Sequence, residues 1–172
     1  IVVVFLEHNV RDYGERFFSS RGWEVRTHVL VDQRVLAHIV QQIEVYKRAL
    51  EKASKPFPDV LPISREMFVG KDRADAIRQA EPYVAAKYKA YHEWGQDKQM
   101  PEGDNDLGMA YEELQDGRFI FGSVDEVAEQ VIALAKATGI NQLGCPVQWI
   151  GMPQSHVIEQ MHLLGEEVLP RV

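Results

Sequence analysis

The chain begins with an uninterrupted apolar run, IVVVFL (residues 1–6), in which β-branched side chains predominate. Apolar and polar residues do not alternate in this run, so a strand formed by it must be covered on both faces, as strands of parallel sheets are. Parallel strands are joined by long crossovers, usually helices. We therefore expect strands and helices to alternate. Because a buried strand stands at position 1 without a preceding cap, we also expect that a segment upstream has been removed.

The remaining sequence shows this alternation. Candidate strands are residues 1–6, 23–31, 61–69 and 143–149. Candidate helices are residues 10–20, 33–50, 73–92, 109–114, 123–138 and 155–169, and Pro82 is expected to kink the third of them. Between the third and fourth strands, residues 95–117 form a polar excursion from the core. Whether this excursion is a lid, a dimer contact or a surface loop stays open at this point.

Several helix ends carry recognisable signals. Ser123 and Glu126 have the Ser-x-x-Glu spacing of a capping box, and Gly139 stands where a C′ glycine ends a helix. The predicted N-caps of three other helices are Asp32, Asp72 and Ser155. The apolar stripes expected to face the core are Leu36, Ile39, Val40, Ile43, Tyr46 and Leu50; Val124, Val127, Ala128, Val131, Ile132 and Ala135; and Ile158, Met161, Leu164 and Leu169.

Strands that alternate with helices predict right-handed βαβ units and a parallel sheet. Two architectures fit the four predicted strands. They form either a small open sheet or half of an eight-stranded (β/α)8 barrel, since a whole barrel takes about 250 residues. The chain has 172 residues, enough for one domain with its own core.

Composition excludes several function classes. With 26 acidic and 19 basic side chains the net charge is -7, which argues against a nucleic-acid surface. The longest apolar run is far too short to cross a bilayer, which takes about 20 residues. The single Cys145 cannot form an internal disulfide, and we expect a protein of the reducing cytoplasm. The six histidines lack metal-ligand spacing, and the sequence contains no serine-hydrolase, Walker or Rossmann motif, so no metal site is predicted.

Ligands of parallel α/β folds bind at the carboxyl ends of the strands. The residues expected there are Glu7, His8, Asn9, Thr27, His28, Gly70, Lys71, Gln148, Trp149, Ile150, Gly151 and Met152. Trp149 and Met152 could pack on a planar ring, or could simply belong to the core. His8, Asn9 and Arg11 precede a helix, where they could bind a phosphate or act as ordinary capping residues.

The carboxyl-terminal segment RFIFGSVDEVAEQVIALAKATGINQLGCPVQWIGMPQSHVIEQMHLLGEEVLPRV resembles the end of luciferase-like (bacterial luciferase family) flavin-dependent oxidoreductases. The segments that match the family's pattern are 122–127, 139–141, 143–149, 151–153 and 167–171. A weaker match, REMFVGKDRADAIRQAEPYV, extends the resemblance to about the last two thirds of the chain.

The resemblance implies that residues 1–172 are a single partial domain, the carboxyl-terminal half (strands 5–8) of a TIM-type (β/α)8 barrel. It also implies FMN as cofactor, or a deazaflavin in its place, bound at the barrel mouth. The residues to which it gives cofactor contacts are Glu7, His8, Asn9, Arg11, Gln148, Trp149 and Met152. At the loop after the first strand many relatives carry Gly and Ser, from which Glu7-His8-Asn9 departs. The family's main catalytic residues lie in the half that this sequence lacks.

The function implied for the parent protein is flavin-dependent monooxygenation or hydride transfer on a small-molecule substrate. Two alternatives remain: a flavin-binding protein without turnover, and a non-enzymatic α/β module that acts through protein contacts. Neither nucleic acid nor a membrane is expected as a partner. Because an open half-barrel has unpaired strand edges, we expect a homo-oligomer, and poor flavin binding by an isolated chain.

Overall fold

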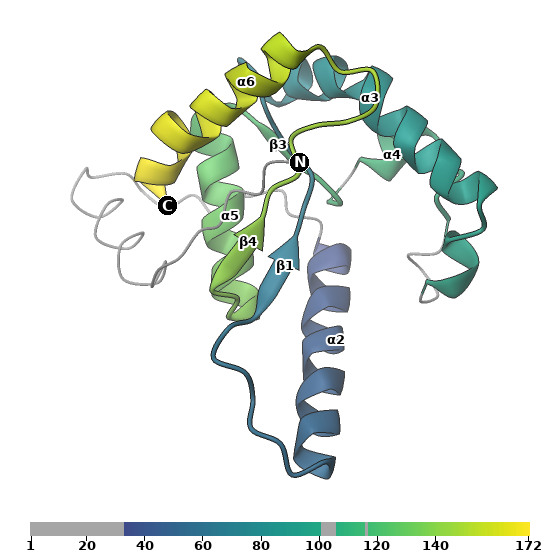
Figure 1. Cartoon of the computed structure of the whole chain (residues 1–172), viewed down its shortest axis with the longest axis vertical. Coiled ribbons are helices and arrows are strands. Elements are labelled where there is room, and N and C mark those ends of the chain that lie inside the picture. Colours follow the sequence, from purple (N-terminus) through teal and green to yellow (C-terminus); the bar gives the residue numbers. More distant parts are fainter. Residues whose placement is uncertain (1–32, 101–105, 116) are drawn as a thin grey trace.

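The computed structural model describes residues 33–100, 106–115 and 117–172 (Figure 1). The strands predicted at 1–6 and 23–31 and the helix predicted at 10–20 lie outside these residues. Within them, short parallel strands are packed against helices, which confirms the α/β class.

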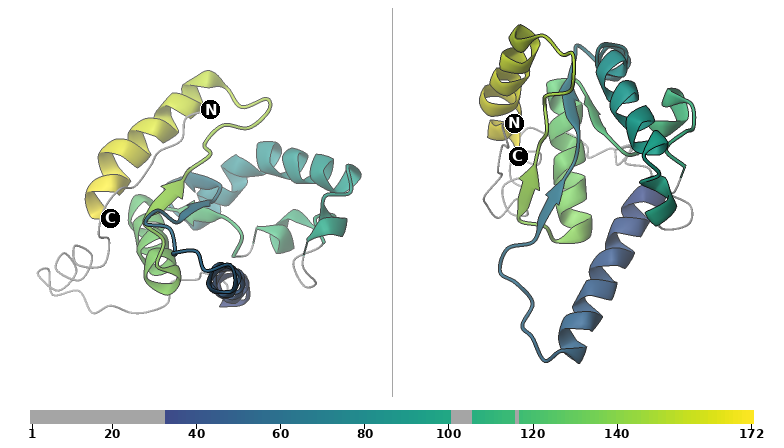
Figure 2. Two further views of the ribbon diagram at one scale, coloured as in Figure 1. Left: turned by 60° about the horizontal axis from the view of Figure 1, so that its bottom comes forward. Right: turned by 45° about the vertical axis from the view of Figure 1, so that its right-hand side comes forward.

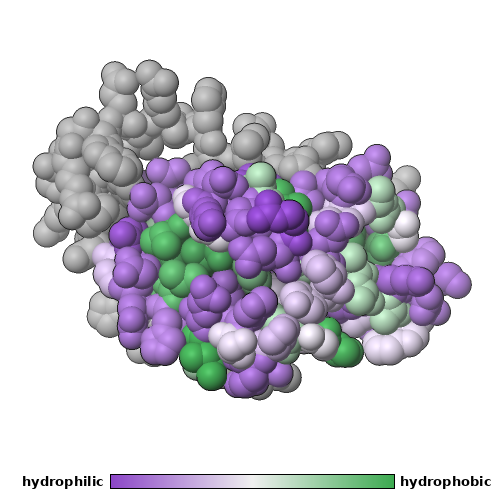
Figure 3. Space-filling view, turned by 90° about the horizontal axis from the view of Figure 1, so that it is seen from above, coloured by the Kyte–Doolittle hydropathy of each residue, from purple (hydrophilic) through white to green (hydrophobic). Residues whose placement is uncertain are grey.

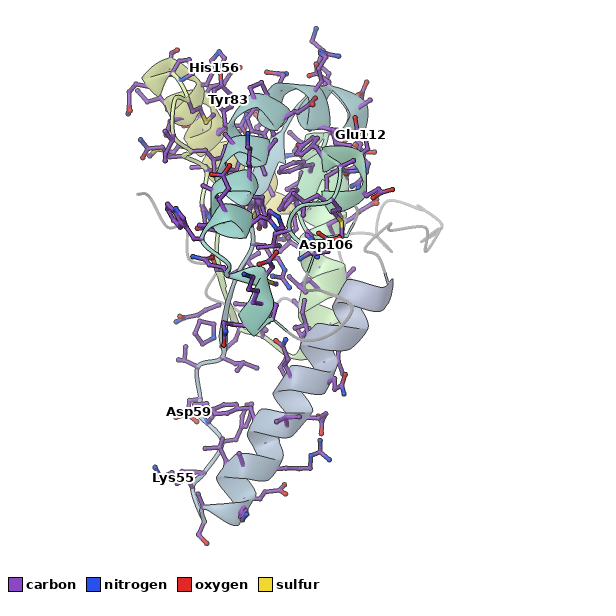
Figure 4. The ribbon with its side chains drawn as sticks, turned by 90° about the vertical axis from the view of Figure 1, so that its right-hand side faces the viewer. Lys55, Asp59, Tyr83, Asp106, Glu112 and His156 are labelled. Atoms are coloured by element: carbon purple, nitrogen blue, oxygen red, sulfur yellow. The ribbon has the colours of Figure 1, made fainter. Side chains whose placement is uncertain are left out.

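The first described element, α2 (Gln33–Lys52), confirms the long helix predicted from residue 33. Its buried side chains Ile39 and Ile43 lie on the side that packs against the helix α5 (Val124–Thr138). The stripe continues to Tyr46, which is 43% exposed and contacts the ring of Phe57 in the segment that returns to the sheet. This end of the molecule protrudes, and Figure 4 shows Asp59 of the return segment far from the end where the helices α3 and α6 lie.

Two short strands follow the return segment, β1 (Pro62–Ser64) and β2 (Met67–Val69). They confirm the strand predicted at 61–69, which the structure divides into two. β1 pairs in parallel with β4 (Gln142–Gly144), and β2 pairs in parallel with β3 (Ile120–Gly122). The segment changes neighbour at its centre, because the Arg65 N–H donates to Gly144 while the Glu66 carbonyl accepts from Ile120, each at 3.0 Å.

β1 and β2 belong to one continuous segment, which pairs with β4 along one edge and with β3 along the other, so this segment lies between β3 and β4. In a barrel whose consecutive strands pair, β3 would instead lie between β2 and β4. The described residues therefore establish parallel strands, whereas the half-barrel stays a prediction.

Two strand predictions need correction. β3 was not predicted, because the run Phe119-Ile120-Phe121 is too short to display a period and follows directly on the polar excursion. β4 begins one residue earlier than predicted and ends at Gly144, and beyond it the Pro146 carbonyl still accepts the Met67 N–H at 3.5 Å. Pro146 explains the early end, since proline has no N–H to donate to a strand ladder.

Two long helices follow β2 and β3 directly. α3 (Arg73–Glu93) is N-capped by Asp72 as predicted, and it includes Pro82. α5 (Val124–Thr138) has the predicted capping box and ends at Gly139, whose φ of 72° is left-handed. Both pack against the β2–β3 pair, as the two views in Figure 2 show. The core accordingly centres on Phe68 and Phe121, which are almost completely buried.

The polar excursion contributes to this core. It contains the short helices η1 (Asp97–Gln99) and α4 (Tyr111–Leu114), and Leu107, Tyr111 and Leu114 are buried. His92, at the end of α3, pairs with the buried Asp97 through Nδ1 and Oδ2 at 2.5 Å.

The last helix is confirmed with a different start and a different inner face. α6 (Gln154–His162) continues as the π-helical segment η2 (Leu163–Val168) and the short η3 (Leu169–Arg171). Its N-cap is Pro153, without a side-chain cap, so Ser155 does not have the predicted role. Ile158 is 45% exposed rather than buried, and the buried positions are Val157, Gln160, Leu164 and Val168.

Candidate functional site at the carboxyl ends of the strands

At the carboxyl ends of β2 and β3 the strand is followed by a helix, and a glycine, Gly70 or Gly122, lies at each of these junctions. A Cβ atom on Gly70 would lie 2.6 Å from the backbone nitrogen of Ala76, and one on Gly122 would lie 2.7 Å from the Glu126 Cβ. Both helices therefore begin directly against the strand ends, at distances that only glycine permits. The Gly70 N–H donates to the Gly122 carbonyl at 2.9 Å, which holds the two turns side by side.

The amino termini of these two helices are occupied by their own carboxylates. Asp75 accepts the Lys71 N–H at 3.0 Å, and Glu126 accepts the Ser123 N–H at 2.7 Å. The Lys71 N–H, and after it Gln79 and the cationic neighbours, hold the pKa of Asp75 below its ordinary value although burial opposes them. Because negative charge already faces the exposed backbone donors, neither terminus is suited to a second anion.

The third turn, between β4 and α6, is built differently. The Met152 N–H donates to the Trp149 carbonyl at 3.1 Å, and Gly151 has a left-handed φ of 83°. At its tip Ile150 is 90% exposed. Seen from the end toward which β1 and β4 run, the surface carries apolar patches between hydrophilic side chains (Figure 3).

Trp149 is the unusual residue of this turn. It is only 5% exposed, and its ring stacks on Phe68 with a centroid separation of 6.1 Å and an interplanar angle of 25°. Among the described residues no hydrogen-bond acceptor reaches its buried indole Nε1–H. Buried donors are nearly always paired, because an unpaired one retains the cost of its desolvation. Trp149 thus presents a donor that a ligand with an acceptor atom would satisfy.

The structure separates the predicted site residues into three groups. It brings Trp149 and Met152 together in one turn, where both are buried. It leaves Gln148 exposed to solvent. Glu7, His8, Asn9 and Arg11 lie outside the described residues, so their assignment stays a prediction.

Sequence reasoning missed Gln160. This side chain on α6 is 3% exposed, and its amide accepts the Val69 N–H at 2.7 Å and donates to the Val69 carbonyl at 2.9 Å. A signal was present, since Gln160 is a polar residue in line with Val157 and Leu164, the buried apolar positions of the same helix.

A second polar cluster lies at the opposite end of β2. The buried Glu66 pairs with Lys87 and accepts the Tyr88 hydroxyl at 3.2 Å. Burial, followed by the negative charge of Glu66, raises the pKa of Tyr88. The Lys87 ammonium lies 5.8 Å and 5.3 Å from the ring centroids of Tyr88 and Tyr91. These contacts hold α3 to the beginning of β2. Because the cluster lies at the amino end of the strand, it is not part of the site at the carboxyl end.

Neither a reactive cysteine nor a metal cluster adds to this site in the described part of the chain. Burial raises the pKa of Cys145 to about 12, so its thiol is a poor nucleophile at neutral pH. No three His, Cys, Asp or Glu side chains among the described residues gather as metal ligands would. In the described ranges, no helix has the length and apolar character required to cross a membrane.

The chain was compared with protein families, curated protein sequences and solved structures. No family model and no curated protein sequence matches the chain. Among solved structures, the chain is similar to a type II Baeyer-Villiger monooxygenase, the oxygenating constituent of 3,6-diketocamphane monooxygenase from the CAM plasmid of Pseudomonas putida, in complex with FMN. The TM-score is 0.59 and the identity 24%, over 80% of this chain and 41% of the other. This likeness concerns the fold, and the chain spans less than half the length of that protein.

Proposed function

We propose that the chain is part of a flavin-dependent monooxygenase of the luciferase-like family and that the flavin binds beside the β4–α6 turn. The observation that carries this proposal is the buried, unpaired N–H of Trp149 among the described residues, at the carboxyl end of a parallel sheet. The likeness to an FMN-bound monooxygenase and the family-like sequence of residues 118–172 both support it.

The residues of this turn fit a flavin chemically. The isoalloxazine ring carries carbonyl oxygens and ring nitrogens that accept hydrogen bonds, which is the complement of an unpaired indole donor. Its planar faces suit a site that contains Trp149 and Met152. FMN is preferred to a deazaflavin because FMN is the cofactor of the similar structure. By the family resemblance, the phosphate would contact Glu7, His8, Asn9 and Arg11; the self-capped termini of α3 and α5 do not suit it.

The protein residues orient the flavin and exclude water from its surroundings. The bound flavin supplies the redox chemistry of oxygen insertion or hydride transfer. Trp149 orients the ring through one hydrogen bond, and Phe68 holds Trp149 in place by stacking. Met152 is buried and Ile150 is exposed, and with the flavin bound these two side chains would exclude water on the two sides of the turn. Self-association and a cytoplasmic location stay predictions.

The decisive experiment is titration of the chain with FMN, followed by the quenching of FMN fluorescence. Trp149→Phe keeps an aromatic ring and removes the N–H, and Trp94→Phe is the matched control because Trp94 is 70% exposed. Trp149→Phe should bind FMN about tenfold more weakly, the effect of losing one buried hydrogen bond and part of a stacked ring. The control should bind like the wild type. Equal affinity of the two variants, or the absence of even the weak FMN binding expected of an isolated chain, would contradict the proposal.

A further inference from the structure

The contact between Gln160 and Val69 replaces a strand pairing. Ile120 donates to the Glu66 carbonyl, and Gly70 donates to the Gly122 carbonyl, so the peptide groups of residues 66 and 70 face β3. Backbone groups alternate along a strand, and those of Val69 therefore face the opposite edge. On that edge the chain of β4 last contacts β2 near Pro146, through the Met67 N–H at 3.5 Å.

A glutamine amide is suited to this position. Its planar carbonyl acceptor and its NH2 donor lie side by side, so it can accept and donate as the peptide groups of a neighbouring strand do. Gln160 uses both on a single residue, Val69, at 2.7 Å and 2.9 Å. The edge of β2 is thereby closed by α6, and the strand end is held on one edge by Gln160 and on the other by the bond from Gly70 to Gly122.

Val69 directly follows Phe68, on whose ring Trp149 is stacked. We propose that Gln160 is a positioning residue, which fixes the end of β2 and through it the Phe68 ring and the direction of the Trp149 N–H. This inference rests on the proposed flavin site, since its purpose is to hold the donor where the ligand needs it. Its first consequence, an ordered Trp149, holds without any ligand.

The chain offers a matched control in Gln130. This residue of α5 is 5% exposed and donates to the carbonyls of Phe121 and Glu126, each at 3.0 Å. Replacing Gln130 or Gln160 by Leu removes a buried amide with two hydrogen bonds, so both variants should lose stability. Only Gln160 contacts the strand end that carries Phe68.

The experiment uses the 172-residue chain with Trp23→Phe and Trp94→Phe, which leaves Trp149 as its single tryptophan. Without ligand, Gln160→Leu should shift the Trp149 emission to longer wavelength and increase its quenching by acrylamide, whereas Gln130→Leu should leave both unchanged. With FMN, Gln160→Leu should weaken binding about tenfold more than Gln130→Leu does. Equal Trp149 emission in the two variants would overturn the inference.

Gln160→Glu covers the case in which the leucine variant does not fold. A protonated carboxyl donates and accepts as the amide does, whereas a carboxylate can only accept. The Trp149 emission of this variant should therefore return toward that of the parent chain as the pH falls, and an emission independent of pH would refute the positioning role. If the parent chain binds no FMN, the proposed function fails, while the emission measurements still decide the role of Gln160.

Discussion

The sharpest test of the fold concerns Gly70. In Gly70→Ala the added Cβ would lie 2.6 Å from the Ala76 nitrogen and 2.9 Å from its Cα, both of them backbone atoms in the first turn of α3. These atoms cannot rotate away, so either the helix or the end of β2 must move. Overpacking of this kind costs about 1–3 kcal/mol, and the usual gain of a few tenths to 1 kcal/mol from replacing glycine offsets only part of it. We expect a net loss of about 1 kcal/mol, or about 2–4 °C in Tm.

The assay is urea unfolding followed by circular dichroism, with Gly165→Ala as the control. Nothing lies within 4 Å of a Cβ at Gly165, which is inside the helical segment η2. Alanine should stabilise that position by about 0.5–1 kcal/mol. Two variants with the same substitution should thus change stability in opposite directions. If Gly70→Ala is as stable as the wild type, the close approach of strand and helix described here is wrong.

Three further predictions concern single groups. Ser123→Ala should cost about 1 kcal/mol by removing the capping box of α5, whereas Ser155→Ala, at a position that caps nothing, should leave the unfolding midpoint unchanged. The pKa of Asp75 is lower in the folded protein than its ordinary value of 3.8, so the ionised carboxylate stabilises the fold at pH values above 3.8, and this contribution is lost as the pH falls through the folded pKa. The difference in unfolding free energy between the wild type and Asp75→Asn should therefore become smaller in acid. A difference that stays constant across pH in urea unfolding would refute this prediction. Cys145, with its pKa raised to about 12, should resist iodoacetamide at pH 8 until urea is added, and mass spectrometry showing alkylation of the native protein would contradict its burial.

The helices could be read from the sequence because their signals are local. The apolar spacing of α2, the Asp72 cap and the pair Ser123 and Glu126 each lie within one or a few turns of the chain. Strand limits depend on partners far away, so β3 was missed and β4 was made too long. The start of α6 was misplaced for a related reason, since a serine can cap a helix only if the chain enters the helix at that residue.

The site was predictable in position and not in detail. Parallel strands directed attention to their carboxyl ends, where Trp149 and Met152 lie. That the indole N–H would be buried without a partner among the described residues depends on packing against Phe68, which no local pattern encodes. The role of Gln160 is a contact across 91 positions and could be suspected only as a polar break in an apolar stripe.

The shared segment from Pro62 to Val69 restricts how this chain can vary in length. Its first half is aligned with β4 and its second half with β3, and Glu66 joins the two alignments. If one residue were lost or gained near Glu66, only one of the two strand pairs could keep its register. The side chains of the other part of the segment would then turn to the opposite face of the sheet. Insertions should therefore be tolerated in the protruding return segment, whereas the segment from Pro62 to Val69 must keep its number of residues.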